Sequence, residues 1–383
     1  PDSGEIILPK QLAVNGCHVS VAGDEQSLCN MCAGIMELDL TDNRLKNWSE
    51  VFNLLHCMPR VHFLNLCNNP LLADSLDDIT NLPSFPLLTK LILNSTLLTW
   101  EAIFKLLGLL PNLGELHLSL IELNELRPLE SDFRFPSVKE LYINRIGIDN
   151  SEKTLCVLGR IFPCLENLVM LNNAVTSLAS TQKEIRESFP CLKSLNISET
   201  ELQEWSEVEK IKFFPVLSSV RLQGIQFLQE IDEKLRRQLL IAYLPNVQRL
   251  NASLINETER NDAERACIRY YMDRPEKPPR YYELEEIHGR LDPLVTVDFT
   301  AQSSVTVMVK YEDRSFLKAL DVHMTMKQAR NLLTKELGLR PKDFTLLHND
   351  ILCPQGPDRM SYPDRHLRRY GVIDGSEIYI VPK

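Results

Sequence analysis

Between positions 61 and 71 the chain reads Val-His-Phe-Leu-Asn-Leu-Cys-Asn-Asn-Pro-Leu. Leu64 and Leu66 are separated by one residue, and residues two apart in an extended strand point to the same side. The two leucines are therefore expected to face a core, whereas Phe63 and Asn65 face outward. The stretch predicts one short strand of a larger parallel sheet.

The same pattern recurs at a regular interval along most of the chain. A proline followed two residues later by an aliphatic residue introduces units spaced 25 to 30 residues apart: Pro59, Pro86, Pro111, Pro136, Pro163, Pro190, Pro215 and Pro245. Two further units precede them, and the first of these is degenerate. Together the units predict strands centred on residues 12, 38, 64, 91, 116, 141, 168, 195, 220 and 250. Repetition with this period and pattern indicates a leucine-rich-repeat solenoid.

The rest of each unit is expected to form a helical convex side. Residues 100–107 place apolar side chains at helical spacing, and the length of a unit leaves room for a short helix. Trp48, Trp100 and Trp205 each precede a glutamate closely, which suits the first turn of a helix because its dipole favours acidic residues there. We interpret these tryptophans as core residues. Asparagine fills the next inward slot of three units and is expected to bond the turn after the strand: Asn43, Asn69 and Asn173.

Four segments are expected along the chain. Residues 1–258 form the solenoid, and a charged helix over 259–272 covers its last hydrophobic face, as a repeat stack requires. A proline-rich, charged linker with a short helical piece follows over 273–295. Residues 296–383 show the order strand, strand, helix, strand and a last strand after an Asp-Gly turn, which resembles a ubiquitin-like β-grasp domain. The expected fold is thus α/β, with a concave parallel sheet and a helical convex side, followed by a small α+β domain.

The outward residues of the strands should line the concave face of the solenoid. Ile92, Tyr142 and Val169 are apolar where solvent would favour polar groups. Scattered surface hydrophobes are normal, but an apolar stripe aligned on one sheet face indicates a protein partner. The partner-binding residues predicted on this face are Asp39, Phe63, Ile92, His117, Tyr142, Val169, Leu171 and Arg221.

Charge is divided unevenly along the chain of 383 residues. Its 42 Lys and Arg stand against 52 Asp and Glu, a net charge of −10, while residues 296–383 hold 13 against 11 and are thus +2. The preceding residues therefore carry −12, which disfavours binding to nucleic acid or to anionic membranes. Within the small domain, Arg365, Arg368 and Arg369 form a basic cluster with His366. This cluster either meets an acidic partner or is a solvated edge.

No group of residues indicates catalysis, a cofactor or a metal site. The eight histidines lack metal-ligand spacing, and no phosphate-binding loop or dinucleotide glycine fingerprint occurs. Cys29 and Cys32 form a single C-x-x-C without a second pair, so we expect them to pack a convex turn. The ten cysteines are scattered and predict no disulfide framework, which favours a reducing, cytosolic compartment. The sequence has no run of about 18 apolar residues, so we expect no membrane-spanning helix.

Several local strings, together with the order of the parts, carry a resemblance that covers essentially the whole chain. The strings are Val-Ala-Gly-Asp-Glu at 21–25, Glu-Leu-Asp-Leu-Thr-Asp-Asn at 37–43, Ile-Arg-Tyr-Tyr at 268–271 and Gly-Val-Ile-Asp-Gly at 371–375. They resemble the tubulin-specific chaperone cofactor E family, and the string at 268–271 is the most specific. Nothing in the chain matches the CAP-Gly domain through which cofactor E reads acidic tubulin tails, which favours the E-like branch.

The resemblance implies a non-enzymatic protein that binds α-tubulin or the αβ dimer and promotes its dissociation or turnover, in the cytoplasm and at the cytoskeleton. A second hypothesis is a scaffold whose repeats hold a client while the β-grasp domain docks to the proteasome or another ubiquitin-like receptor. A third is a structural component of a microtubule assembly. Since the last residues are Val-Pro-Lys rather than Gly-Gly, we do not expect a conjugated modifier.

Overall fold

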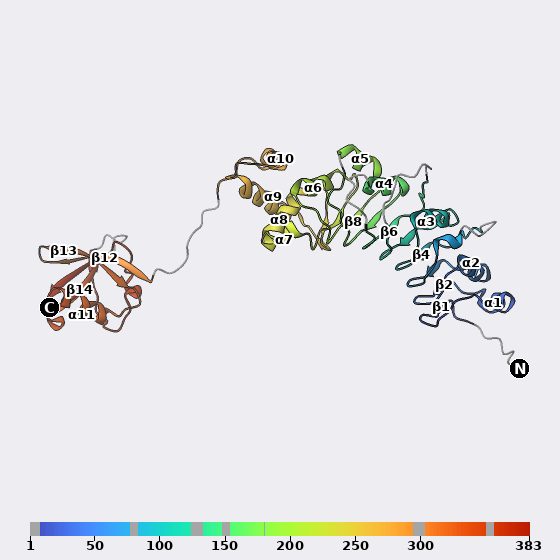
Figure 1. The fold of residues 1–383 in the computed structure, drawn as a ribbon. Helices are drawn as coiled ribbons and strands as arrows, with labels where there is room; N and C mark the ends of the chain where they lie inside the picture. The colour runs from blue at the N-terminus through green and yellow to red at the C-terminus, as the bar shows by residue number, and fades with distance from the viewer. Residues whose placement is uncertain are drawn as a thin grey trace. The chain divides into compact units, whose positions relative to one another are not determined.

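The computed structural model describes residues 8–76, 83–123, 133–147, 154–179, 181–293, 303–349 and 356–383. The chain separates into two compact units, with the division between Pro293 and Leu294 (Figure 1). The domain boundary expected at residue 296 lies outside the described residues.

The first unit is built on one curved sheet whose strands follow one another in sequence order, and each neighbouring pair up to β10 is parallel. Its described strands are β1 (Gln11–Ala13), β2 (Glu37–Asp39), β3 (Phe63–Asn65), β4 (Lys90–Ile92), β5 (Glu115–His117), β6 (Glu140–Tyr142), β7 (Asn167–Val169), β8 (Ser194–Asn196), β9 (Ser219–Arg221), β10 (Arg249–Leu250) and β11 (Ser253–Leu254). All ten predicted strand centres are confirmed. The last strand, β11, was not predicted; it turns back and pairs antiparallel with β10.

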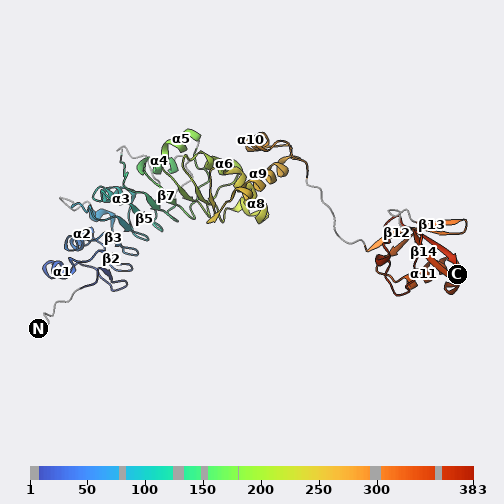
Figure 2. The ribbon, with the colours of Figure 1, turned by 180° about the vertical axis from the view of Figure 1, so that it is seen from behind.

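Helices cover the convex side, as Figures 1 and 2 show from opposite directions. The described helices, with η marking a 3-10 helix, are α1 (Glu25–Cys32), α2 (Trp48–Cys57), η1 (Ala73–Leu76), α3 (Trp100–Leu107), α4 (Thr154–Ile161), α5 (Gln182–Ser188), α6 (Trp205–Lys210), η2 (Ile211–Phe213), α7 (Gln226–Gln229) and α8 (Glu233–Tyr243). The three tryptophans begin α2, α3 and α6, as predicted. Trp48 and Trp100 are buried, and the half-buried Trp205 stacks on Tyr243 with ring centroids 4.8 Å apart.

Asparagine side chains join successive rungs. Asn69 is 1% exposed, and its Nδ2 donates to the carbonyl oxygens of Leu66 in its own rung and of Leu40 in the preceding one. Its Oδ1 accepts from the backbone N–H of Leu45. In the same slot Thr96 makes one bond, from its hydroxyl to the Leu93 carbonyl. The predicted role of the asparagines is therefore confirmed.

Two helices close the end of the solenoid: α9 (Glu257–Tyr271) and α10 (Pro279–His288). The cap helix begins slightly earlier than the expected residue 259 because the Asn256 side chain accepts from the N–H of Glu259. The second helix lies within the expected linker 273–295, yet Arg280 is 5% exposed and donates from Nε to the carbonyl of Ala242 at 2.7 Å. The repeat unit therefore extends through α10.

The second unit is a five-stranded sheet of described strands in the order β13-β12-β16-β14-β15, with one long helix packed on it. Its elements are β12 (Ser304–Tyr311), β13 (Arg314–Asp321), α11 (Met326–Glu336), η3 (Pro341–Asp343), β14 (Phe344–Asn349), β15 (Asp358–Arg359), η4 (Leu367–Tyr370) and β16 (Glu377–Pro382). The first and last strands pair parallel in the middle of the sheet. This arrangement is the predicted β-grasp fold. Among the described strands of this unit, only the short β15 was not predicted.

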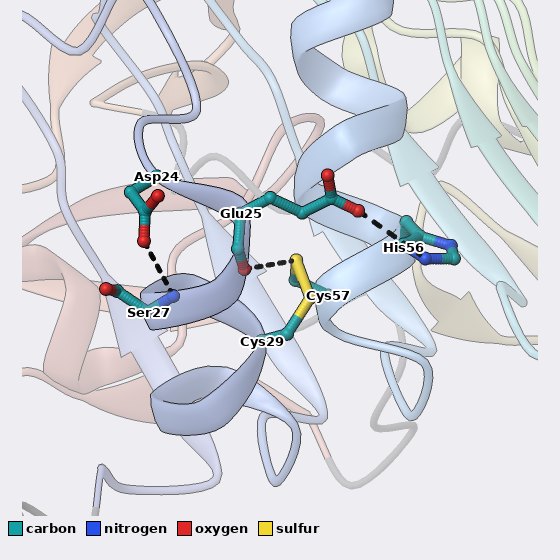
Figure 3. Close-up of a disulfide and its surroundings, with 6 residues drawn as sticks. All are labelled: Asp24, Glu25, Ser27, Cys29, His56 and Cys57. Carbon is teal, nitrogen blue, oxygen red and sulfur yellow. Dashed lines mark hydrogen bonds and ion pairs between the residues drawn. A yellow bond between two sulfur atoms is a disulfide. The ribbon is translucent and has the colours of Figure 1, made fainter.

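A disulfide joins Cys29 of α1 to Cys57 at the end of α2 (Figure 3). The expectation that the cysteines form no disulfide is therefore wrong for this pair. Helices of adjacent rungs lie side by side, so residues 28 positions apart meet on the convex surface. The other described cysteines are free: Cys17, Cys32, Cys67, Cys156, Cys164, Cys191 and Cys267.

Candidate partner-binding surface

The concave face is formed by the first and third residues of each three-residue strand, because the central leucine or valine points into the core. The parallel register aligns the third residues into one row: Asp39, Asn65, Ile92, His117, Tyr142, Val169, Asn196 and Arg221. The predicted residues from Asp39 to Arg221 that belong to this row are thus brought together by the fold. Phe63 lies in the neighbouring row of first residues, and Leu171 follows two positions after Val169.

Two stacked rings occupy the centre of the row. The rings of His117 and Tyr142 are 4.1 Å apart between centroids, with an interplanar angle of 8°. Nε2 of His117 lies 2.7 Å from Oε1 of Glu115, and the Tyr142 hydroxyl donates to Oε2 of Glu140 at 2.9 Å. Asn167 donates to the same hydroxyl at 3.3 Å. The carboxylates at the start of β5 and β6 therefore hold both rings in place.

Glu115 is the electrostatic centre of this network. Its carboxylate also pairs with Nζ of Lys90 at 2.7 Å. Partial burial by itself raises the pKa of the Glu115 carboxyl, but hydrogen bonds from Lys90 and His117 outweigh it and leave the pKa below its usual range. Partial burial and the bond to Glu140 raise the pKa of Tyr142 to about 12, so its phenol stays a neutral donor at physiological pH.

The apolar members of the surface are less exposed than the sequence suggested. The side chains that are half-buried here are those of Ile92, Val169, Leu171 and Phe63. Lys90 also lies over the Phe63 ring, 5.6 Å from its centroid. The surface is therefore a mixed, ordered face with apolar side chains set between charged ones.

The ends of the row differ from its centre. Asp39 is turned toward its own turn, where Oδ1 accepts from the backbone N–H and hydroxyl of Thr41. Arg221 is exposed and projects from the last full strand of the row. The predicted residues of the sheet whose side chains pack against other side chains of this face thus lie between β3 and β7.

An open depression of about 570 Å³ lies beside the row, along the first residues of the strands. It is lined by Glu37, His62, Phe63, Thr89, Lys90, Gly114, Glu115, Lys139 and Glu140. Sequence reasoning missed the basic members of this lining. Lys90 is the first residue of β4, and His62 and Lys139 directly precede β3 and β6. Their positions relative to the predicted strand centres were therefore enough to predict that they lie along this edge of the concave face.

The remaining predicted residues, Arg365, Arg368 and Arg369, belong to the second unit, where all three are exposed. They form a surface of their own and are not part of the concave row. Within the ranges that the structure describes, no group of three His, Cys, Asp or Glu side chains could hold a metal ion. The same residues include no helix that is long and apolar enough to cross a membrane.

Fold and surface together define a leucine-rich-repeat protein with an ordered concave face and an added β-grasp domain. No protein-family model matches the chain. It is 36% identical to the human tubulin-specific chaperone cofactor E-like protein over 100% of this chain and 90% of that protein. The protein of the same name from Caenorhabditis elegans is 27% identical over 97% of this chain and 85% of its own length. The chain belongs to the family of tubulin-specific chaperone cofactor E-like proteins.

Similarity extends to related proteins at lower identity. The tubulin-folding cofactor E of Arabidopsis thaliana is 27% identical over 94% of this chain and 72% of that protein. Among solved structures, the C-terminal ubiquitin-like domain of mouse tubulin-specific chaperone e matches 22% of this chain and 94% of that domain, with 18% identity and a TM-score of 0.20.

Proposed function

We propose that this chain is a non-enzymatic tubulin-binding protein that regulates tubulin stability in the cytoplasm and at the cytoskeleton. It binds α-tubulin or the αβ dimer and promotes dissociation or turnover of the dimer. The observation that carries the proposal is the 36% identity to a tubulin-specific chaperone cofactor E-like protein along the whole chain, through both units.

The concave surface supports a binding role. Its rings are held by Glu115 and Glu140, so little side-chain freedom is lost when a partner covers them. Half-buried apolar groups such as Ile92 provide surface to bury, while the acidic excess of the solenoid favours a partner face with basic residues. A ligand shifts an equilibrium only by its differential affinity for the two states. Dimer dissociation therefore requires that the chain bind one free subunit more tightly than the intact dimer.

A sizing-column experiment with purified αβ-tubulin tests the proposal. We expect a complex of the chain with tubulin and a shift from dimer toward single subunits. Ile92→Asp, which places a charge next to His117 in the row, is expected to weaken the complex about tenfold, because an unpaired carboxylate would be desolvated in the interface. Thermal unfolding should change little, since Ile92 is only half-buried.

Asn196→Asp provides the matched control. It adds the same charge to the same row at a position that is already polar, and the new carboxylate still accepts from the N–H of Ser198. Equal loss in both variants would mean that net charge, not the apolar side chain of Ile92, determines binding. Absence of any complex with the unaltered chain would contradict the proposal.

The two other hypotheses predict different outcomes. A scaffold of the ubiquitin–proteasome system would capture proteasome subunits without tubulin through its β-grasp domain. A structural microtubule component would co-sediment with polymer and leave free dimer unbound. Both measurements are made with the full chain, and either result in place of a tubulin complex would favour the corresponding alternative.

A further inference from the structure

The second unit carries exposed arginines between two tyrosines, in the segment that joins β15 to β16. This arginine–tyrosine patch consists of Tyr362, Arg365, Arg368, Arg369 and Tyr370. We propose that it binds an acidic peptide segment of a partner protein. The proposal goes beyond tubulin regulation and does not depend on the concave surface.

The backbone beneath the patch is fixed on one side by the first residue of α11 and by the segment that precedes this helix. The N–H of Met326 donates to the carbonyl of Arg365, and the N–H of Arg368 donates to the carbonyl of Val322, both at 2.9 Å. Leu367, between the arginines, is fully buried. The arginine side chains therefore project from an ordered edge, and binding need not order a loop.

Aromatic rings orient one of the arginines. The guanidinium of Arg365 lies 5.1 Å from the ring centroid of Tyr362 and 5.4 Å from that of Tyr370. The Tyr370 hydroxyl accepts from the N–H of Tyr362 at 2.7 Å and donates to its carbonyl at 2.9 Å, which locks the two tyrosines together. Cation–π contact holds the guanidinium without using its N–H donors. Those donors remain available for a carboxylate.

None of the three arginines forms an ion pair with the described residues. On the same unit, Lys310 pairs with Glu377 at 2.6 Å and Lys318 with Glu336 at 2.8 Å. Nearby His366 is not available, because its Nδ1 contacts the carbonyl of His323. Asp364 is the one acidic residue between positions 362 and 370, so the patch is a net positive edge. Its planar guanidinium groups match carboxylates in bidentate geometry.

Charge favours a short peptide over a long polyanion. The chain as a whole carries −10, with −12 on the residues before 296, so an extended nucleic acid would meet repulsion. A short acidic segment interacts mainly within a Debye length of about 8 Å and responds to the patch alone.

Fluorescence anisotropy with the full chain tests the proposal. The probe is a labelled short glutamate-rich peptide, and the reference probe has glutamine in place of each glutamate. We expect binding of the acidic probe only, with an affinity that falls as salt is raised. Replacing Arg365, Arg368 and Arg369 together by glutamine should weaken binding about tenfold.

A charge-matched control removes three positive charges elsewhere on the unit: Arg314→Gln, Lys335→Gln and Lys342→Gln. It should retain most of the affinity, and an equal loss would overturn the proposal. Tighter binding of a single-stranded oligonucleotide than of the acidic peptide would also overturn it, in favour of a nucleic-acid site. Thermal unfolding of both variants checks that they fold. Since tubulin is absent from the assay, its outcome is separate from that of the tubulin-binding experiment.

Discussion

Glu115 connects the charged and aromatic parts of the concave surface. It pairs with Lys90 and contacts His117, whose ring stacks on Tyr142. Its side chain is 24% exposed, so solvent screens these interactions only in part. At the residue scale, individual carboxylates hold the side chains of this surface in place, and a single substitution can remove each carboxylate.

Replacing Glu115 with glutamine is expected to lower the free energy of unfolding by about 0.5–1 kcal/mol near neutral pH. The folded-state pKa of the carboxyl is lowered, so its stabilising contribution is present above the unfolded pKa and is lost as pH falls through the folded one. The difference between the native chain and the variant should therefore shrink on acidification. Urea unfolding at neutral and acidic pH measures it, with the exposed Glu122→Gln as control. A difference that persists in acid would contradict this account.

At the scale of elements, rungs are held together by features that repeat with the period of the sequence. Asn69 bonds the backbone of two rungs from a buried position, and the disulfide between Cys29 and Cys57 joins the helices of the first two. The asparagine position can be predicted from the repeat pattern, whereas the disulfide depends on which helices are neighbours.

Asn69→Ala is expected to cost about 2–3 kcal/mol, because it removes the hydrogen-bond partner of two buried backbone groups, the N–H of Leu45 and the carbonyl of Leu66. Asn69→Thr should cost less, since Thr96 shows that a hydroxyl in this slot still reaches the carbonyl of the strand. The midpoints of urea unfolding compare the two variants. Equal losses would show that the bonds between rungs, rather than the bond within the rung, carry the whole effect.

Cys29→Ser is expected to lower stability by about 3 kcal/mol in non-reducing buffer, because it releases the closed loop between α1 and α2. The effect should nearly vanish in the presence of a thiol reductant. Thermal unfolding in both buffers measures it, and Cys17→Ser, at an exposed free cysteine, serves as control. The same loss with and without reductant would instead indicate a packing defect.

At the scale of the whole molecule, the helices at the end of the solenoid determine how far the first unit can be truncated and still fold. Tyr271 of α9 bonds the hydroxyl of Tyr243 at 3.0 Å, and Tyr281 and Leu284 of α10 belong to the same core. Both helices cover the last rung, which otherwise presents apolar side chains to water.

Residues 1–293 are therefore expected to fold alone, with the same unfolding temperature as the repeat unit of the full chain. Residues 1–258, the solenoid expected from sequence, should unfold at least about 10 °C lower, because the loss of α9 and α10 exposes the core around Tyr243. Calorimetry of the two fragments makes the comparison. Equal unfolding temperatures would mean that the two helices are not part of the repeat unit.

Sequence alone determined the ten rungs, the helical positions of Trp48, Trp100 and Trp205, and the order of the β-grasp strands, because these follow from local periodicity and turn residues. Tertiary structure decided which side chains meet across rungs. The stack of His117 on Tyr142, the Cys29–Cys57 disulfide and the seating of α10 each join residues far apart in the chain. Periodicity specifies the face on which a side chain lies, but contacts between faces depend on the register and packing of whole elements.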